Sequence, residues 1–273
     1  MELSSMFNRL WADYTGNNPS AKRIADLFTE KGEIVVNDHI AFRTLDDPAI
    51  NIDVIAKPFI VNGFVPKGEY YFADKHLFAR HFELPGDANA PRVFISQLIM
   101  KDFSEFLRQT LTNALKRVNQ RIVRNEELLF AGNIFEPLSY EAYNRLRDES
   151  EYAAWFYVFG FRANHFTVCV NALKTYDTLE KVNILLKENG YLLNASGGEI
   201  KGSETDYLRQ SSTMADVIKV RFVEGVYDIP CCYYEFAQRY YTPEGELFSG
   251  FVARSADKIF ESTDFYEKSQ VKR

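Results

Sequence analysis

The fold is best predicted from one segment, Val36-Asn37-Asp38-His39-Ile40-Ala41-Phe42-Arg43-Thr44. Its apolar residues, with Gly32 and Pro48 on either side, indicate a β-strand. Because strand side chains alternate between two faces, His39 and Arg43 are predicted to point to the same face. An imidazole and a guanidinium on one face suit a ligand that has a carboxylate and binds a metal. The alternative is an ordinary half-buried strand with a hydrogen-bonded histidine and a surface arginine.

This strand opens a predicted βαβββ unit, and a second unit of the same order follows later in the chain. In the first unit the strands are predicted at 33–44, 64–67, 76–84 and 92–99, and the helix runs from Asp46-Asp47-Pro48 to Asn62-Gly63. In the second unit the strands are predicted at 161–171, 191–194, 217–223 and 231–239, and the helix at 176–188.

Shared landmarks indicate that the two units are an internal duplication. Each opening strand carries a histidine, His39 or His165, with an asparagine just before it, Asn37 or Asn164. Asn-Gly followed by an aromatic residue comes 23 residues after the first histidine and 24 after the second. Asn-Gly alone is weak support because it commonly ends helices, but its registration with the histidines strengthens the prediction.

We expect an α+β fold in one compact domain. Residues 1–32 are predicted to form an N-terminal helical cover and 33–100 the first unit. Residues 101–158 are predicted to form a helical connector, and 159–273 the second unit with a C-terminal extension. A chain of 273 residues can bury a large core, and its aromatic content of 15% suits an aromatic core or pocket.

Composition narrows the classes of partner. The net charge of −6 argues against nucleic-acid binding, which usually requires a basic face. No apolar run reaches the length of a membrane span, and Met1-Glu2-Leu3-Ser4 does not begin a secretory signal. Cys169, Cys231 and Cys232 form no CxxC pair, so we expect reduced thiols in a cytoplasmic protein.

Pairing of the two units about a pseudo-twofold axis would bring His39 and His165 to one cleft. A first-row metal in that cleft needs a third ligand, and the best candidate is Glu235, a carboxylate in an apolar and aromatic strand. Two histidines and one carboxylate make the facial triad of non-heme Fe(II) oxygenases, which leaves positions for substrate and oxygen. The alternative for Glu235 is an ion pair with Arg239.

Other polar residues are less specific. Gln97 is predicted to hold roughly the position in the first unit that Glu235 holds in the second, where it would orient a substrate or a ligand. His81 could line the pocket, and His76 is expected to face solvent. Ser211-Ser212-Thr213 has no partner histidine in a nucleophile motif, so we expect these hydroxyls in a turn or a pocket.

Several segments together resemble the 2-oxoadipate dioxygenase/decarboxylase family, and the resemblance covers most of residues 30–265. Besides the opening strand, they are Phe94-Ile95-Ser96-Gln97-Leu98, Asn164-His165-Phe166-Thr167, Ser211-Ser212-Thr213-Met214-Ala215-Asp216 and Tyr233-Tyr234-Glu235-Phe236-Ala237-Gln238-Arg239. The resemblance implies a vicinal-oxygen-chelate fold, a half-open β-barrel that agrees with the duplication.

The resemblance also implies the site residues. Fe(II) would be bound by His39, His165 and Glu235. The substrate would be contacted by His39, by Arg43 and by the segment at Arg254 and Ser255. An arginine at position 254 is not the usual residue of the family, which leaves the exact 2-oxo acid open.

The implied reaction converts 2-oxoadipate and O2 to 2-hydroxyglutarate and CO2, as in lysine catabolism. Two other functions stay open. One is a metal-dependent lyase or isomerase of the same fold that needs no oxygen, which the glutamine at position 97 disfavours because it is a poor fourth ligand. The other is a module that binds 2-oxo acids without catalysis. The sequence does not give the oligomeric state.

Overall fold

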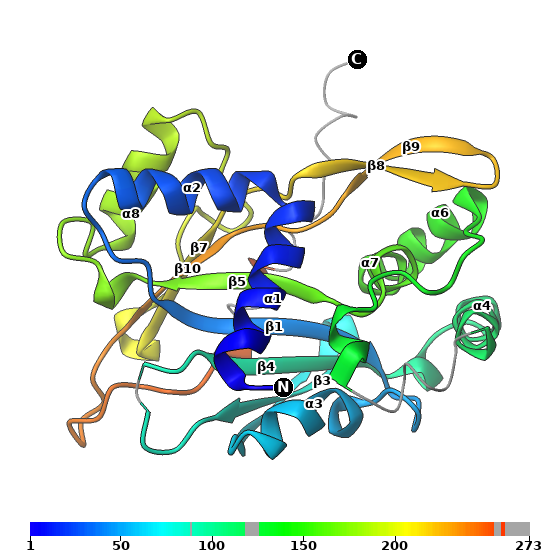
Figure 1. Cartoon of the computed structure of the whole chain (residues 1–273), viewed down its shortest axis with the longest axis horizontal. Coiled ribbons are helices and arrows are strands. Elements are labelled where there is room, and N and C mark those ends of the chain that lie inside the picture. The colour runs from blue at the N-terminus through cyan, green and yellow to red at the C-terminus, as the bar shows by residue number, and fades with distance from the viewer. Residues whose placement is uncertain (88, 118–125, 254–257, 260–273) are drawn as a thin grey trace.

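The computed structural model describes residues 1–87, 89–117, 126–253, 258 and 259. Its centre is one curled eight-stranded sheet with helices packed around it (Figure 1). The strands of this sheet are β1 (Asn37–Leu45), β2 (Val65–Phe72), β3 (Leu77–Glu83), β4 (Arg92–Leu98), β5 (Ala163–Cys169), β6 (Lys201–Ser203), β7 (Leu208–Ser212) and β10 (Glu235–Arg239). A separate hairpin consists of β8 (Val217–Phe222) and β9 (Gly225–Pro230).

The strand order confirms the duplication. It reads β2-β3-β4-β1-β5-β10-β7-β6, so each strand of the first unit has a counterpart at the same distance from the centre. The two opening strands, β1 and β5, pair antiparallel in the middle. In this pairing His39 lies opposite Thr167, and His165 lies opposite Ala41. Each histidine therefore pairs with the residue two positions after the histidine of the other strand. This reciprocal register is what a pseudo-twofold axis between the two strands requires.

Two β-bulges break this central pairing at symmetric places. On β1 the extra residue is Asp38, and on β5 it is Asn164, so each bulge falls directly before a histidine. A bulge bends its strand and re-aims a side chain that would otherwise point to the opposite face. The sequence analysis matched Asn164 with Asn37, which was wrong, because the counterpart of Asn164 is Asp38.

Helices α3 (Ile52–Val61) and α8 (Leu179–Glu188) are the crossovers of the two units. Both end as predicted, in an asparagine followed by a glycine with positive φ, 95° at Gly63 and 82° at Gly190. Their starts were predicted too early, because the capping side chains are those of Asn51 and Thr178.

The strands of the second unit were predicted less well. Residues 191–194 contribute only a bridge at Leu193, and β8 belongs to the separate hairpin. The strands that pair in the main sheet, β6 and β7, were missed. Consequently Ser211 and Ser212 lie in a strand and not in a turn.

The remaining α-helices of the described residues are α1 (Leu3–Asn17), α2 (Pro19–Glu30), α4 (Glu105–Lys116), α6 (Tyr140–Glu149) and α7 (Glu151–Phe159). Helix α1 packs on the central strands, where the rings of Trp11 and Tyr14 contact Phe166 at centroid distances of 5.1 and 5.0 Å. Because Phe166 follows His165 on β5, α1 covers the face of the sheet opposite the histidines. The proposed division at residues 32, 100 and 158 stays a prediction.

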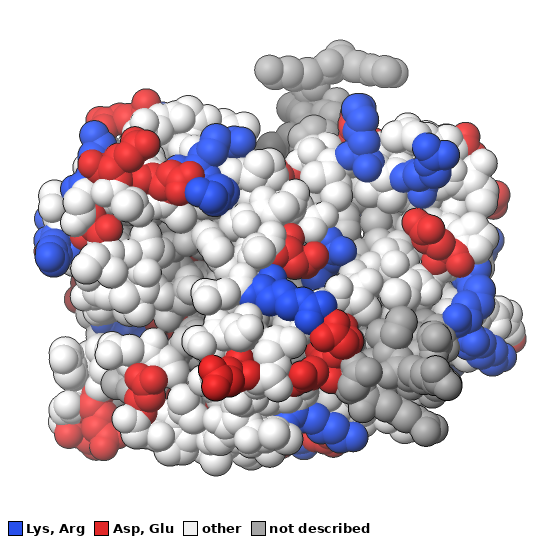
Figure 2. All heavy atoms as spheres, viewed as in Figure 1, with Lys and Arg blue, Asp and Glu red and all other residues white. Residues whose placement is uncertain are grey.

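None of the helices in the described parts of the chain combines the length and the hydropathy needed to cross a bilayer. On the face shown in Figure 2, the basic and acidic side chains of the described residues lie mixed with one another.

Candidate metal centre

Three adjacent strands bring the predicted ligands together. His39 comes from β1, His165 from β5 and Glu235 from β10, and all three side chains are buried. Nε2 of His39 lies 3.6 Å from one carboxylate oxygen of Glu235, and Nε2 of His165 lies 3.3 Å from the other. One ligand atom from each residue lies within 4.8 Å of the others. The three residues could therefore hold one metal ion.

The residue before each histidine fixes the orientation of its ring. Nδ1 of His39 donates a hydrogen bond to Oδ1 of Asp38 at 2.8 Å, and Nδ1 of His165 donates to Oδ1 of Asn164 at 2.9 Å. The bulges on β1 and β5 make these contacts possible, because a regular strand would turn neighbouring side chains to opposite faces. With Nδ1 protonated, the lone pair of each ring is on Nε2, the atom that faces Glu235. This arrangement is typical of histidines that bind metals.

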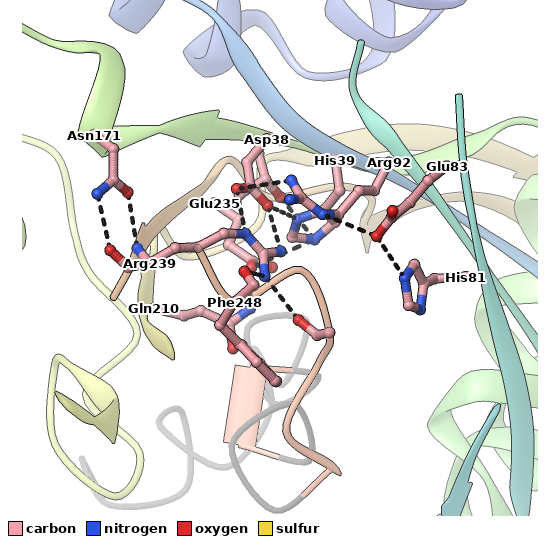
Figure 3. Close-up of polar contacts among 12 residues, drawn as sticks. Asp38, His39, His81, Glu83, Arg92, Asn171, Gln210, Glu235, Arg239 and Phe248 are labelled. Carbon is pink, nitrogen blue, oxygen red and sulfur yellow. Dashed lines mark hydrogen bonds and ion pairs between the residues drawn. The ribbon is translucent and has the colours of Figure 1, made fainter. Parts of the chain in front are cut away.

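Asp38 is in turn held by a buried arginine (Figure 3). Nε and one terminal nitrogen of Arg239 donate to its two carboxylate oxygens at 2.7 and 2.8 Å. Burial alone would raise the pKa of Asp38, but the charge and hydrogen bonds of Arg239 bring this pKa below its usual range. The predicted alternative, an ion pair between Arg239 and Glu235, is therefore not the contact that Arg239 makes.

The electrostatics of the site favour a bound cation. Burial raises the pKa of Glu235 to about 8, although the hydrogen bond donated by Gln210 opposes this rise. Burial also lowers the pKa of His165 well below its usual value, and the charges of His39 and Arg43 act in the same direction. A buried carboxylate beside two neutral imidazoles is costly to ionise without a positive partner, and a divalent cation would supply one. The donor set thus fits a first-row metal.

Arg43 is buried and not on the surface, with 3% of its area exposed. Its guanidinium carbon lies 4.9 Å from the ring centroid of Tyr152 and 5.0 Å from that of Trp155. These rings place its charge close enough to contribute to the lowered pKa of His165. Arg43 also lines a cavity of about 400 Å³, together with exposed polar residues such as Asp74 and His76. The alternative of a surface arginine on this strand was wrong.

Gln97 does not hold the position expected for it. In the parallel pairing of β1 with β4, Phe94 lies opposite the second residue after His39. In the parallel pairing of β5 with β10, Glu235 lies opposite the second residue after His165. The counterpart of Glu235 is therefore Phe94. Oε1 of Gln97 accepts the N–H of Ile52, the first residue of α3, at 3.1 Å. In the second unit Gln238 does the same for the first residue of α8, so both glutamines cap a crossover helix.

An aromatic ring that the sequence analysis missed lies against the metal centre. Phe251 packs edge-on against His39, with a centroid distance of 4.8 Å, and lies 4.7 Å from Phe94. Its N–H donates to the hydroxyl of Tyr70 at 3.1 Å, and Arg239 donates to the backbone oxygens of Phe248 and Gly250 just before it. Arg239 therefore ties this loop to the same carboxylate that orients His39.

The other predicted residues separate into three groups. His81 is buried beside Phe251 and bonds Tyr70, as expected of a pocket residue, whereas His76 is partly exposed and pairs with Asp102 at 3.3 Å. The hydroxyl of Ser211 donates to Asn183 and has no histidine partner among the contacts of the described residues. Arg254 and Ser255 lie outside the described residues.

Comparison with known proteins places this site in a family. The family model of 2-oxoadipate dioxygenase/decarboxylase matches residues 6–136 and 133–248. The chloroplastic 2-oxoadipate dioxygenase/decarboxylase of Arabidopsis thaliana is 34% identical to this chain, over 95% of the chain and 76% of the relative.

Solved structures agree with this assignment. Hydroxyglutarate synthase from Oryza sativa, in complex with 2-oxoadipate, superposes with a TM-score of 0.90 at 31% identity, covering 98% of this chain and 93% of that one. A Shewanella frigidimarina protein for which a hydrolase function has been suggested gives 0.88 at 42% identity, covering 92% and 98%. A Ralstonia eutropha protein assigned to the glyoxalase superfamily gives 0.74 at 19% identity, covering 89% and 83%, which is a likeness of fold alone.

These likenesses confirm the half-open barrel of the vicinal-oxygen-chelate type. The family expected from the sequence motifs is also the one that the family model and the plant relative identify. The chain therefore belongs to the 2-oxoadipate dioxygenase/decarboxylase family.

Proposed function

We propose that the protein is an Fe(II)-dependent dioxygenase/decarboxylase that converts 2-oxoadipate and O2 to 2-hydroxyglutarate and CO2. The observation that carries this proposal is the buried set of His39, His165 and Glu235, with both imidazoles oriented by Nδ1 contacts. Membership of the family supports the substrate, because the rice relative was crystallised with 2-oxoadipate.

In this proposal the iron, held by three protein ligands, supplies binding positions for the 2-oxo acid and the activation of O2. Arg43 binds a substrate carboxylate through its planar guanidinium and fixes which carbon of the chain faces the metal. Phe251 and the neighbouring aromatic rings keep water away from the reacting atoms. Contacts of the substrate with Arg254, Ser255 and Gln97 stay predictions.

The identity of the metal ion needs an experiment of its own. Two imidazoles and a carboxylate also bind Zn(II) or Ni(II), and affinity alone favours some of these ions over Fe(II). The protein should therefore be stripped of metal and reloaded with each ion separately. We expect oxygen-dependent turnover only with Fe(II).

The decisive experiment measures oxygen uptake and product together. Reconstituted protein with 2-oxoadipate should consume one O2 for each 2-hydroxyglutarate and each CO2 formed, and His39→Ala should lose both metal and turnover. Conversion without oxygen would favour the lyase or isomerase alternative. Binding of 2-oxo acids with no conversion at all would favour the non-catalytic module.

The wider setting stays a prediction. A role in lysine catabolism follows from the proposed substrate alone. The cytoplasmic location rests on the sequence, whereas the Arabidopsis relative is a chloroplastic protein. A free 2-oxo acid and O2 are the proposed partners, and the negative net charge of −6 is the reason to expect no nucleic-acid partner.

A further inference from the structure

Tyr233 lies at the metal centre without any role assigned so far. It precedes β10 by two residues, and its side chain is fully buried. Its ring stacks on the ring of His165, with a centroid distance of 4.8 Å and an interplanar angle of 26°. Tyr233 therefore forms a wall of the site beside one of the three candidate ligands.

The hydroxyl of Tyr233 has no hydrogen-bond partner among the described residues. Buried hydroxyls in folded proteins are normally paired, because an unpaired one loses its bonds to water and gains nothing in return. An unpaired hydroxyl in the wall of a binding site is therefore a position that a ligand can fill.

Trp155 relates the position of Tyr233 to that of Arg43. The indole N–H of Trp155 donates to the backbone oxygen of Cys231, two residues before Tyr233. The guanidinium carbon of Arg43 lies 5.0 Å from the ring centroid of the same indole, so Arg43 and the segment just before β10 both contact Trp155. A phenolic hydroxyl can donate one hydrogen bond, and a carboxylate oxygen can accept it.

Buried contacts hold Tyr233 firmly in this place. Its backbone oxygen accepts the hydroxyl of Tyr14 from α1, and the oxygen of Cys231 accepts the indole N–H of Trp155 from α7. On the other side, Thr213 bonds the backbone of Tyr234 through both its N–H and its hydroxyl. A donor fixed in this way loses little conformational entropy when it binds a ligand.

We propose that the hydroxyl of Tyr233 donates a hydrogen bond to the substrate carboxylate that Arg43 binds, the one remote from the metal. This inference rests on the proposed function and names a second determinant of its substrate class. Arg43 supplies the charge for that carboxylate, and Tyr233 supplies a neutral donor from the segment just before β10. Together they would select 2-oxo diacids over 2-oxo acids that have a single carboxylate.

The test is Tyr233→Phe, which removes the hydroxyl and keeps the ring that stacks on His165. Binding of 2-oxoadipate and of 2-oxohexanoate, which has the same number of carbons and lacks the second carboxylate, is measured by calorimetry on Fe(II)-loaded protein without oxygen. Because a hydrogen bond to a charged group is lost, we expect 2-oxoadipate to bind about 10- to 100-fold more weakly. The affinity for 2-oxohexanoate should change less than about threefold, and the metal content should not change.

The matched control is Tyr234→Phe. The hydroxyl of Tyr234 is also buried and unpaired among the described residues, but its ring packs against Trp11, Tyr14 and Phe236 on the other side of the sheet. This variant should bind both acids as the wild type does.

The outcomes separate this inference from the proposed function. If wild type binds neither acid, the proposed function fails and the inference falls with it. If wild type binds 2-oxoadipate and Tyr233→Phe binds it equally well, only the inference fails. Equal weakening of both acids also overturns it, because that result would mean that Tyr233 acts through His165 and not on the remote carboxylate.

Discussion

Replacing Asp38 by asparagine should separate the two roles of this residue. In the native site, Oδ1 accepts from His39 and from Arg239, and Oδ2 accepts from Nε of Arg239. An asparagine can keep the contact with His39, as Asn164 does for His165. Its NH2 group would then face the Nε–H of Arg239, donor against donor, and the buried guanidinium would lose its counter-ion.

The size of the effect follows from the burial of this pair. The side chains of Asp38 and Arg239 are each 1% exposed, so water cannot replace the lost partner. Removing one member of such a pair typically costs about 3–5 kcal/mol. A domain of ordinary stability has only about 5–15 kcal/mol in total, so the loss should be large in an unfolding experiment. Affinity for the metal should fall less than about tenfold, because the bond to His39 remains.

The assay is urea unfolding of metal-free wild type and Asp38→Asn, followed by metal titration of both. The double variant Asp38→Asn with Arg239→Met is the control, because it removes the unpaired charge and should recover part of the lost stability. A loss below about 1 kcal/mol for the single variant, or no recovery in the double variant, would refute the reasoning.

Four further variants test other parts of the site and of the helix caps. Asn164→Ala should weaken metal binding about 10- to 100-fold in a titration while lowering stability little, because only the orientation of His165 is lost; unchanged affinity would contradict this. Phe251→Ala should let water reach the metal, so that oxygen uptake exceeds product formation; a ratio that stays at one would show that the ring does not protect the reaction. Gln97→Ala and its counterpart Gln238→Ala should each lower the free energy of unfolding by about 1 kcal/mol, because each loses a helix cap. A KM for 2-oxoadipate that rises only in Gln97→Ala would instead favour the predicted contact of Gln97 with the substrate.

Much of the fold could be predicted because it rests on long-range repetition. The duplication was visible in the two histidines and the two Asn-Gly helix ends, and the strand order confirms it. The strands of the first unit were found from their apolar and aromatic residues, although β2 runs on to Phe72, beyond the predicted end at residue 67. Strands β6 and β7 were missed because they are short and rich in polar residues, such as Gln210 and Ser211, that face the site or a helix.

The missed parts of the site depend on local geometry that a pattern of period two cannot reveal. A bulge adds one residue and leaves no clear trace in hydrophobicity, so the contacts of Asp38 and Asn164 with the histidines could not be foreseen. The ion pair of Arg239 with Glu235 was considered as an alternative because the two are close in sequence, while the actual partner, Asp38, comes from the other unit. Gln97 was aligned with Glu235, although the true counterpart of Glu235 is Phe94, three residues earlier on β4.

The most direct test of the account is the position of iron in a crystal grown without oxygen and soaked with 2-oxoadipate. Anomalous scattering at the iron edge should show one site per chain, about 2.0–2.2 Å from Nε2 of His39, Nε2 of His165 and an oxygen of Glu235. An iron site that lacks any one of these three side chains, or that lies elsewhere in the protein, would contradict it.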